Sequence, residues 1–516
     1  MSGQLMKSTA VVGLMTLVSR VLGFLRDMVI ARLFGADAAT DAFFVAFRIP
    51  NFLRRLFAEG SFAQAFVPLL AGHGEDRDGF RRLIDRATGA LALLFLLATL
   101  AGVVLAPVLI LVFAPGFLDQ PGQLDLGSRL LQITFPYLFF VVLTAFAGAI
   151  LNAAGRFAVP AFTPALLNLS MIAAAIWLAP HLAEPVSALA WGVLLAGLAQ
   201  LVLQIPFLAA AGLLPRPRID FRDAAVRSLL KRMGPAIFGV SVTQVNLLVD
   251  TLLASFLMSG SVSWLYYSDR LVEFPLGIFG VALGSAILPQ LSKTHVQKDP
   301  RRFSHTLDWG LRWVLLIGLP ATVGLLVLAE PLMATLFRYD EFGERDVLMA
   351  SRSLKTYASG LVGFIAVKIL AAGYGARHDL RTPVRYGIYA MLANALLGLG
   401  FTLALAPRGW GHAGLALATA LAALLNAGLL LGGLIRARIY RPLDGWGLFL
   451  SRVILGNVLM GWLLTQAAGG LPWLEWGASE RVLQLGLWIG AGGGAYFLAL
   501  AVLGLRPIHL QTREAI

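Results

Sequence analysis

The sequence contains no cysteine and few charged residues. The absence of cysteine among 516 residues excludes disulfide bonds and thiol chemistry. Charged residues make up 13% of the chain, against roughly 25% in soluble globular proteins, whereas hydrophobic residues make up 58%. No polar block is long enough to form a soluble domain. The composition therefore indicates an integral membrane protein in which nearly the whole chain belongs to the membrane unit.

Several functional signatures are also missing. The chain has no G-x-x-x-x-G-K-[ST] loop, so nucleotide hydrolysis is not expected. Its histidines have no paired ligands, so neither a resident metal nor a cofactor is predicted. The first apolar run, residues 9–34, has spanning length and lacks an A-x-A-type cleavage site, which favours a membrane span over a cleaved signal peptide.

Acidic residues are scarce, with 28 Asp and Glu against 41 Lys and Arg, which gives a net charge of +13. In a soluble protein this excess would suggest nucleic acid. In a membrane protein it mostly reflects loop charges that set the topology, so no nucleic-acid partner is expected.

Apolar segments of spanning length predict an all-α polytopic membrane protein with fourteen transmembrane helices. The segments are residues 9–34, 41–71, 87–114, 128–152, 160–180, 186–213, 233–258, 262–291, 306–333, 350–375, 384–405, 412–435, 446–467 and 484–505.

Alternate connections between these segments differ in charge. The basic set comprises the connections around residues 77–86, 214–232, 293–302, 377–385 and 436–441, whereas the other set, around residues 35–40, 114–127, 179–185 and 259–261, is poor in Lys and Arg. By the positive-inside rule the basic set is cytoplasmic. An even number of spans then places both termini in the cytoplasm.

A weak internal repeat suggests two lobes of six helices. Residues 27–35 (DMVIARLFG) resemble residues 250–260 (DTLLASFLMSG). Chance recurrence of Gly, Ala, Leu and Arg in helical hairpins is the alternative. A true repeat predicts parallel lobes with a site near the membrane midplane. The predicted organisation is an N-terminal lobe (1–213), a basic cytoplasmic linker (214–232), a C-terminal lobe (233–435) and two further helices with the C-terminal tail (436–516).

Arginines inside the apolar segments are the most informative feature. Such a residue at the centre of a lipid-facing helix costs about 2.5–3.5 kcal/mol on insertion scales. The deep arginines are Arg20 and Arg26 in the first segment, Arg54 and Arg55 in the second, and Arg270 in the eighth. They are therefore expected to face a wet cavity and to bind an anion.

Carboxylates accompany these arginines at helical spacing. Arg20 and Asp27 lie seven residues apart and share a helix face. Arg270 and Glu273 lie one turn apart. Four residues of the second segment follow a near-heptad stripe, namely Asp41, Arg48, Arg55 and Glu59. Snorkelling or ion pairing is the alternative, and it suits Arg32, Arg48 and Arg55.

For the deeper Arg20, Arg26, Arg54 and Arg270, a phosphate-bearing ligand is the simpler explanation. The guanidinium is a planar fork that grips phosphate with two hydrogen bonds and keeps its charge at any relevant pH. Asp41, Glu59 and Glu273 would hold the arginines in place when no ligand is bound.

The same residues carry a family resemblance. Residues 19–27 (SRVLGFLRD), 40–48 (TDAFFVAFR), 50–60 (PNFLRRLFAEG) and 264–270 (WLYYSDR) resemble the MurJ (MviN) family of lipid II flippases, over essentially the full length. The resemblance implies a fourteen-helix transporter of the MOP superfamily. It would move lipid II, an undecaprenyl-diphosphate-linked disaccharide peptide, from the inner to the outer leaflet of the bacterial cytoplasmic (inner) membrane, in cell-wall biosynthesis.

The resemblance also implies roles for particular residues. Residues matching Arg20, Arg26, Arg54 and Arg270 line the central cavity in the family, with acidic residues matching Asp27, Asp41, Glu59 and Glu273 in or near it. The last two helices are associated with a groove for the polyprenyl tail. Membrane lipids and cell-wall synthesis proteins are the further partners expected.

Some members bind sodium in the C-terminal lobe. Asp250 matches the acidic ligand, with Asn394 and Thr419 as companions. One turn after Asn394 the chain has Gly398, where a second carboxylate would be expected, and a single carboxylate makes a weaker site for a hard cation. Coupling to sodium or to the membrane potential therefore stays open.

These observations predict a flippase that works by alternating access around the arginines. The rivals are a flippase for another lipid-linked oligosaccharide of the same superfamily, a multidrug exporter, and a scaffold that recruits wall enzymes. A membrane glycosyltransferase is a further rival, for which the acidic loop at residues 339–346 is the candidate catalytic segment. A drug exporter usually transports cations, so its cavity would be expected to be lined by acidic residues. A scaffold would have no use for arginines deep in the membrane.

Overall fold

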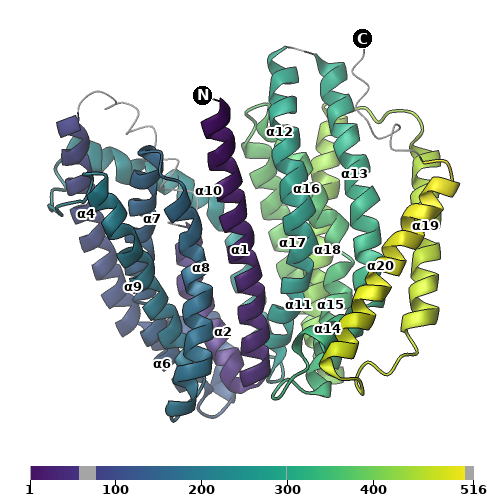
Figure 1. The fold of residues 1–516 in the computed structure, drawn as a ribbon, viewed down its shortest axis with the longest axis horizontal. Coiled ribbons are helices and arrows are strands. Elements are labelled where there is room, and N and C mark those ends of the chain that lie inside the picture. Colours follow the sequence, from purple (N-terminus) through teal and green to yellow (C-terminus); the bar gives the residue numbers. More distant parts are fainter. Residues whose placement is uncertain (1, 57–76, 298, 506–516) are drawn as a thin grey trace. The chain divides into compact units, whose positions relative to one another are not determined.

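The computed structural model describes residues 2–56, 77–297 and 299–505, and this part of the chain is helical, without a β-strand (Figure 1). This confirms the predicted all-α class. The chain forms two compact units, Met1–Val262 and Ser263–Ile516.

The first unit consists of α-helices joined by short helical turns. They are α1 (Ser2–Phe34), α2 (Ala38–Leu56), α4 (Arg77–Val104), α5 (Ala106–Phe113), the 3-10 turn η2 (Pro115–Asp119), α6 (Gln123–Thr134), α7 (Tyr137–Ala153), α8 (Ala158–Ala173), the π-helical turn η3 (Ala174–Leu178), the 3-10 turn η4 (Ala179–His181), α9 (Ser187–Ala210) and α10 (Ala224–Ser255).

The second unit continues in the same way. Its elements are α11 (Ser261–Pro275), which begins at the unit boundary, the π-helical turn η5 (Leu276–Gly280), α12 (Val281–Val296), α13 (Pro300–Val327), α14 (Ala329–Phe337), α15 (Glu344–Ala358), α16 (Leu361–Gly375), α17 (Arg381–Leu405), the 3-10 turn η6 (Ala406–Arg408), α18 (Gly411–Arg436), α19 (Trp446–Ala468) and α20 (Ala478–Val502).

The predicted spans fall on these helices. Each of the fourteen apolar segments lies on helical chain, and the second continues from α2 into residues that the structure does not describe. Within the described residues, ten helices are long and apolar enough to cross a membrane, or eleven if α15 and α16 form one span bent by 41°. The chain is thus a multi-pass membrane protein.

Several spans are broken, each at a recognisable position. Pro107 follows the break between α4 and α5, and Pro136 lies between α6 and α7. Proline lacks the N–H that would continue the helical hydrogen bonds and disfavours a helical residue before it. The sequence predicts a single helix for each of these segments because the apolar character is continuous across the break.

In the first unit, α1 packs along α8, and α10 packs against α2, α4 and α5. α10 therefore groups with the first unit, whereas the predicted C-terminal lobe begins at residue 233. The basic linker is also partly helical, because α10 begins at Ala224. Asp223 caps that helix by accepting hydrogen bonds from the backbone N–H groups of Ala225 and Val226.

In the second unit, α16 is a central helix that packs against α12, α13 and α18. Glycines permit the closest of these approaches. A Cβ built at Gly360 would lie 2.5 Å from the Ala420 Cα, and one at Gly363 would lie 2.9 Å from the Leu424 nitrogen. Small residues at such crossings let helix backbones approach in a membrane, where packing drives association.

The last two helices, yellow in Figure 1, are tied to α13 and α14 by polar contacts. The Tyr496 hydroxyl on α20 donates to the Leu316 carbonyl at 2.8 Å. The buried Arg481, near the start of α20, donates to the carbonyls of Ala334 and Arg338 at the end of α14. The pair α19–α20 is therefore part of the second unit.

Candidate functional site

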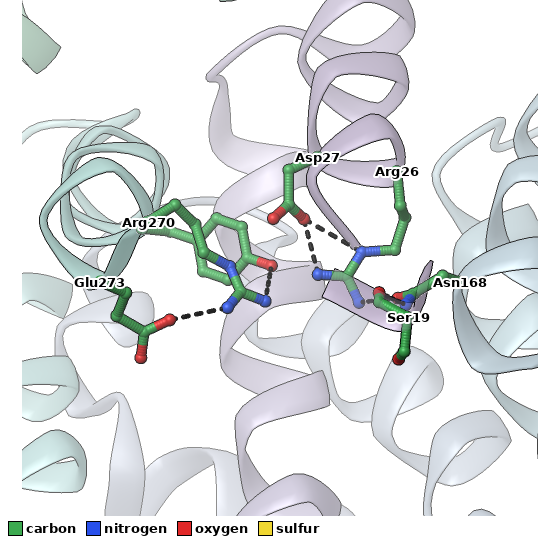
Figure 2. Close-up of polar contacts among 7 residues, drawn as sticks. Ser19, Arg26, Asp27, Asn168, Arg270 and Glu273 are labelled. Carbon is green, nitrogen blue, oxygen red and sulfur yellow. Dashed lines mark hydrogen bonds and ion pairs between the residues drawn. The ribbon is translucent and has the colours of Figure 1, made fainter. Parts of the chain in front are cut away.

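Arg26 is the most deeply buried of the predicted site arginines, with 3% of its surface exposed. Its Nε and Nη2 atoms donate to Asp27 Oδ1 at 3.0 and 2.6 Å, and its Nη1 atom donates to Asn168 Oδ1 at 3.0 Å (Figure 2). Asp27 is 1% exposed. The charge of the guanidinium is thus compensated within α1, and the α8 amide fixes its direction.

Asn168 joins the two helices that hold this arginine. Its Nδ2 atom donates to the backbone carbonyl of Ser19 on α1 at 3.0 Å. Gly23 faces the amide, and a Cβ built there would lie 3.4 Å from Asn168 Nδ2, in van der Waals contact with it. The glycine therefore leaves space for the Asn168 amide beside α1.

Arg20 lies exposed on another side of α1. Gly13, Thr16 and Arg20 recur three to four residues apart and form a small, polar stripe. Exposed apolar side chains occupy a separate stripe of the same helix: Leu14, Leu17, Val21 and Leu25. Arg20 therefore lies at the border between the small, polar stripe and the apolar stripe, with Leu17 one turn away.

On α2, Arg54 is partly buried and its Nε atom donates to Asn51 Oδ1 at 2.9 Å, one turn earlier. Arg48 donates to the Thr251 hydroxyl on α10, which gives it a partner inside the first unit. The predicted stripe continues to Glu59, which lies outside the described residues. Arg54 therefore places its charge near the end of α2, beside the neutral amide of Asn51.

Asp41 lies in the first turn of α2 and is 3% exposed. Its Oδ2 atom accepts a hydrogen bond from the backbone N–H of Gly260 at 2.7 Å. Gly260 has φ +92°, a backbone conformation that favours glycine. Asp41 thus holds the turn that follows α10, a structural role that residue spacing did not indicate.

In the second unit, Arg270 and Glu273 form the predicted pair one turn apart on α11. Arg270 Nη1 lies 2.8 Å from Glu273 Oε2, and Nη2 donates to the Tyr266 hydroxyl at 3.3 Å (Figure 2). The Arg270 guanidinium also lies over the Tyr266 ring, 5.4 Å from its centroid. Its side chain is 32% exposed, so a ligand can reach it, in contrast to Arg26.

The two units therefore offer arginines in two states. Arg26 is buried and held by an amide and a carboxylate, whereas Arg20 and Arg270 retain surface that an anion can approach. The Arg270–Glu273 pair is partly exposed. Ion pairs in contact with water contribute about 0–1 kcal/mol to stability, so Glu273 can exchange for a phosphate oxygen at small cost. This arrangement is suited to binding an anionic ligand reversibly.

The residues of the predicted sodium site belong to different parts of the chain. Asp250 lies on α10 in the first unit and is 6% exposed. Asn394 lies on α17 and Thr419 on α18, two helices that pack along each other in the second unit. Asn394 is 1% exposed. Sodium binding by these three residues stays a prediction.

The candidate catalytic segment of a glycosyltransferase is the acidic loop at residues 339–346, and two of its carboxylates have structural partners. Asp346 accepts from the Gly343 backbone N–H at 3.0 Å and from Trp264 Nε1 at 2.9 Å. Glu344 forms an ion pair with Arg338 at 2.6 Å. These two carboxylates therefore hold the start of α15 and the chain before it.

Sequence reasoning did not identify three side chains that bear on the site. Asn168 and Tyr266 carry no charge that would single them out in an apolar segment, and only the packing shows that they hold arginines. Lys368 is different because it is the only charged residue of the apolar helix α16, and charge within an apolar stretch is the signal that identified the arginines. It could have been found in the same way.

The fold resembles those of solved transporters. Over 95% of this chain and 98% of the other, it matches "Lipid II flippase MurJ, inward closed conformation" with a TM-score of 0.79 and 24% identity. It also matches an inward-facing MATE multidrug resistance transporter of the MOP superfamily, with a TM-score of 0.65 and 15% identity over 82% of this chain and 94% of the other. Helical spans and fold thus define a multi-pass membrane protein that shares the fold of these transporters.

Comparison of sequences narrows this class. The family model described as "Lipid II flippase MurJ" matches residues 30–474. Probable lipid II flippases MurJ of Vibrio cholerae and Haemophilus influenzae are 48% and 46% identical, covering 99% and 97% of this chain and 98% and 100% of their own lengths. The lipid II flippase MurJ of Burkholderia cenocepacia is 40% identical over 96% of this chain and 97% of its own length. The chain belongs to the MurJ family of lipid II flippases.

Proposed function

We propose that this protein translocates lipid II from the inner to the outer leaflet of the bacterial cytoplasmic membrane. The observation that carries the proposal is the partly exposed guanidinium of Arg270 on a membrane-spanning helix of a MurJ family chain. A diphosphate carries the charge and the paired oxygens that such a group binds best.

In this proposal the arginines have two roles, contact with the substrate and supply of a fixed positive charge. Arg20, Arg54 and Arg270 contact the diphosphate, and Arg270 exchanges Glu273 for a phosphate oxygen. Arg26 is held in place by Asp27 and Asn168 and supplies a fixed positive charge. The diphosphate reduces repulsion among the arginines and so favours closure of the lobes around the headgroup, while the polyprenyl tail stays in lipid.

The energy source follows from the charge of the substrate. Moving one negative charge outward from a negative interior is favourable by about 2.3 kcal/mol per 100 mV. The membrane potential can therefore drive export of the diphosphate. Sodium binding at Asp250, Asn394 and Thr419 would add a second source, and replacing sodium by choline at a fixed potential tests it, because only that source requires sodium.

The proposal includes orientation and reaction class. Both termini lie in the cytoplasm, with the basic connections on that side. The protein acts as a transporter without catalysis, which agrees with the structural partners of Asp346 and Glu344 in the acidic loop. Membrane lipids surround it, and cell-wall synthesis proteins are the proteins expected to receive its product.

The alternative is a flippase for another lipid-linked oligosaccharide, since the arginines recognise the diphosphate and not the sugars. The test is exposure of the lipid II headgroup on the outer leaflet of cells depleted of their own flippase. Wild type should restore exposure, and Arg54→Ala and Arg270→Ala should not. Arg408→Ala is the matched control, because Arg408 is exposed in η6. Failure of well-inserted wild type would favour the alternative substrate.

A further inference from the structure

Lys368 is a cation within the membrane-spanning part of the second unit. It lies in the middle of α16, between Leu361 and Gly375, and it is the only residue of this helix whose side chain is exposed. The rest of α16 is buried or partly buried because α12, α13 and α18 pack around it. Lys368 therefore lies on the side of α16 that these three helices leave open.

The residues that share this side of α16 with Lys368 are uncharged, and two of the three are small. Phe364, Ala371 and Gly375 lie within about one turn of Lys368 or of each other on the same face, and they are partly exposed. Helices with large exposed faces in this unit present leucine instead, as α17 does at Leu392, Leu396, Leu399 and Leu403. Because a charged side chain at mid-helix is costly against lipid, Lys368 indicates that this side of α16 is hydrated.

The neighbouring helix leaves room for the lysine. A Cβ built at Gly284 on α12 would lie 3.9 Å from the Lys368 Cβ, so the glycine adds no side chain beside the lysine stem. Among the residues that the structure describes, Lys368 has no ion pair and no hydrogen bond from its amine. A charge kept in a membrane span without a carboxylate partner implies a ligand or water.

Snorkelling to the nearer helix end explains this placement less well. Gly375 ends α16 seven residues later, roughly 10 Å along the axis. Side chains of a helix tilt toward its N-terminus, which is away from that end. The lysine stem is therefore directed toward the interior of the span and not toward the basic connection at residues 377–385.

We propose that Lys368 is a further substrate contact, which binds an anionic oxygen of the lipid-linked headgroup. This inference rests on the proposed function. The ammonium is a compact point charge that suits phosphate or carboxylate without demanding a fixed geometry. A diphosphate and a peptide carboxylate both offer such an oxygen, and they can be separated by experiment.

The test measures binding of two probes to the full chain in nanodiscs, lipid II and undecaprenyl diphosphate, which lacks sugar and peptide. The variants are Lys368→Met, Lys368→Arg and Gly284→Val, which keeps the lysine and places a branched side chain beside it. Lys293→Met is the matched control, since Lys293 is exposed at the end of α12. Correct folding is checked by the thermal transition of each variant.

Lys368→Met should weaken lipid II binding about tenfold, as loss of one charged contact does. Lys368→Arg and Lys293→Met should bind within about twofold of wild type, and Gly284→Val should fall between them. An equal loss for undecaprenyl diphosphate assigns Lys368 to the diphosphate, and a loss for lipid II alone assigns it to a headgroup carboxylate.

Equal binding by wild type and Lys368→Met, with binding lost in Arg270→Ala, would overturn the role of Lys368 and leave the proposed function intact. No binding of lipid II by folded wild type would instead remove the proposed function, and the role of Lys368 with it.

Discussion

Asn168 and Arg26 are 142 positions apart in the chain, and the Asn168 amide oxygen accepts a hydrogen bond from Arg26 Nη1 at 3.0 Å. The same amide donates to the Ser19 carbonyl, so α8 holds both the arginine and the helix that carries it. The direction of a buried charge in the first unit therefore depends on a neutral side chain.

Replacing Asn168 should impair transport by releasing Arg26. Asn168→Leu removes the acceptor and leaves a buried charged donor with one partner fewer, at a cost of about 1–3 kcal/mol. Lipid II exposure should fall strongly, whereas Asn168→Asp, which keeps an acceptor, should retain part of it. The control is Asn152→Leu at an exposed position on α7. If Asn168→Leu supports normal exposure, the orientation of Arg26 is not limiting.

The shape of the Arg270 side chain should matter as well as its charge. Arg270→Lys keeps the charge but loses the planar fork, so the lipid II concentration for half-maximal transport should rise about tenfold. Glu273→Gln removes the competing carboxylate and should lower that concentration at low salt. Rates measured against lipid II concentration in proteoliposomes check both. Wild-type behaviour of Arg270→Lys would argue against bidentate phosphate binding.

Asp308 on α13 should be important for stability. This carboxylate is 1% exposed and accepts from Arg312 Nε at 2.8 Å and from Tyr440 Oη and Trp446 Nε1 at 2.7 Å. Asp308→Ala breaks a buried pair and should lower the free energy of unfolding by about 3–5 kcal/mol.

Thermal unfolding in detergent measures this loss. The double variant Asp308→Ala/Arg312→Ala should be less destabilised than the sum of the single variants, because the two residues interact. Additive losses of stability would show that Asp308 and Arg312 do not stabilise the fold through their ion pair. Asp444→Ala is a suitable control in the same connection, since Arg312 contacts its backbone carbonyl and not its carboxylate.

Asp223 should make a pH-dependent contribution at the start of α10. Burial acts to raise the pKa of Asp223, but hydrogen bonds from the Val226 N–H and from Arg86 outweigh it and hold the pKa below its usual value of 3.8. A carboxylate with a lowered pKa stabilises the folded state above its unfolded pKa, and this is lost as the pH falls below about 4.

The stability difference between wild type and Asp223→Asn should therefore be constant from pH 7 to pH 5 and shrink below about pH 4. Thermal transitions at several pH values measure it. A difference that is unchanged at pH 3 would mean that the amide and the carboxylate differ only in hydrogen bonding.

The spans and the arginines could be predicted from sequence because both are local features. A long apolar run predicts a helix, and an arginine within it is conspicuous. The spacing of Arg270 and Glu273 was also enough to predict their contact. Breaks such as the one before Pro107 were not predicted, because the apolar pattern continues through them.

Partners from other helices could not be predicted in this way. The contact of Asn168 with Arg26, and that of Asp41 with Gly260, depend on which helices pack together and in which rotation. A polar residue in an apolar segment does not specify its neighbour. The free surface of Lys368 likewise depends on Gly284 of another helix.

The central claim is that intramembrane arginines bind the diphosphate of lipid II while it crosses the bilayer. The most direct measurement is translocation of fluorescent lipid II in proteoliposomes, followed by chemical quenching of the label from outside. Wild type should accelerate loss of the protected fraction under an imposed potential, and Arg270→Ala should match empty liposomes. Equal rates for wild type and Arg270→Ala, or no acceleration by folded wild type, would contradict the claim.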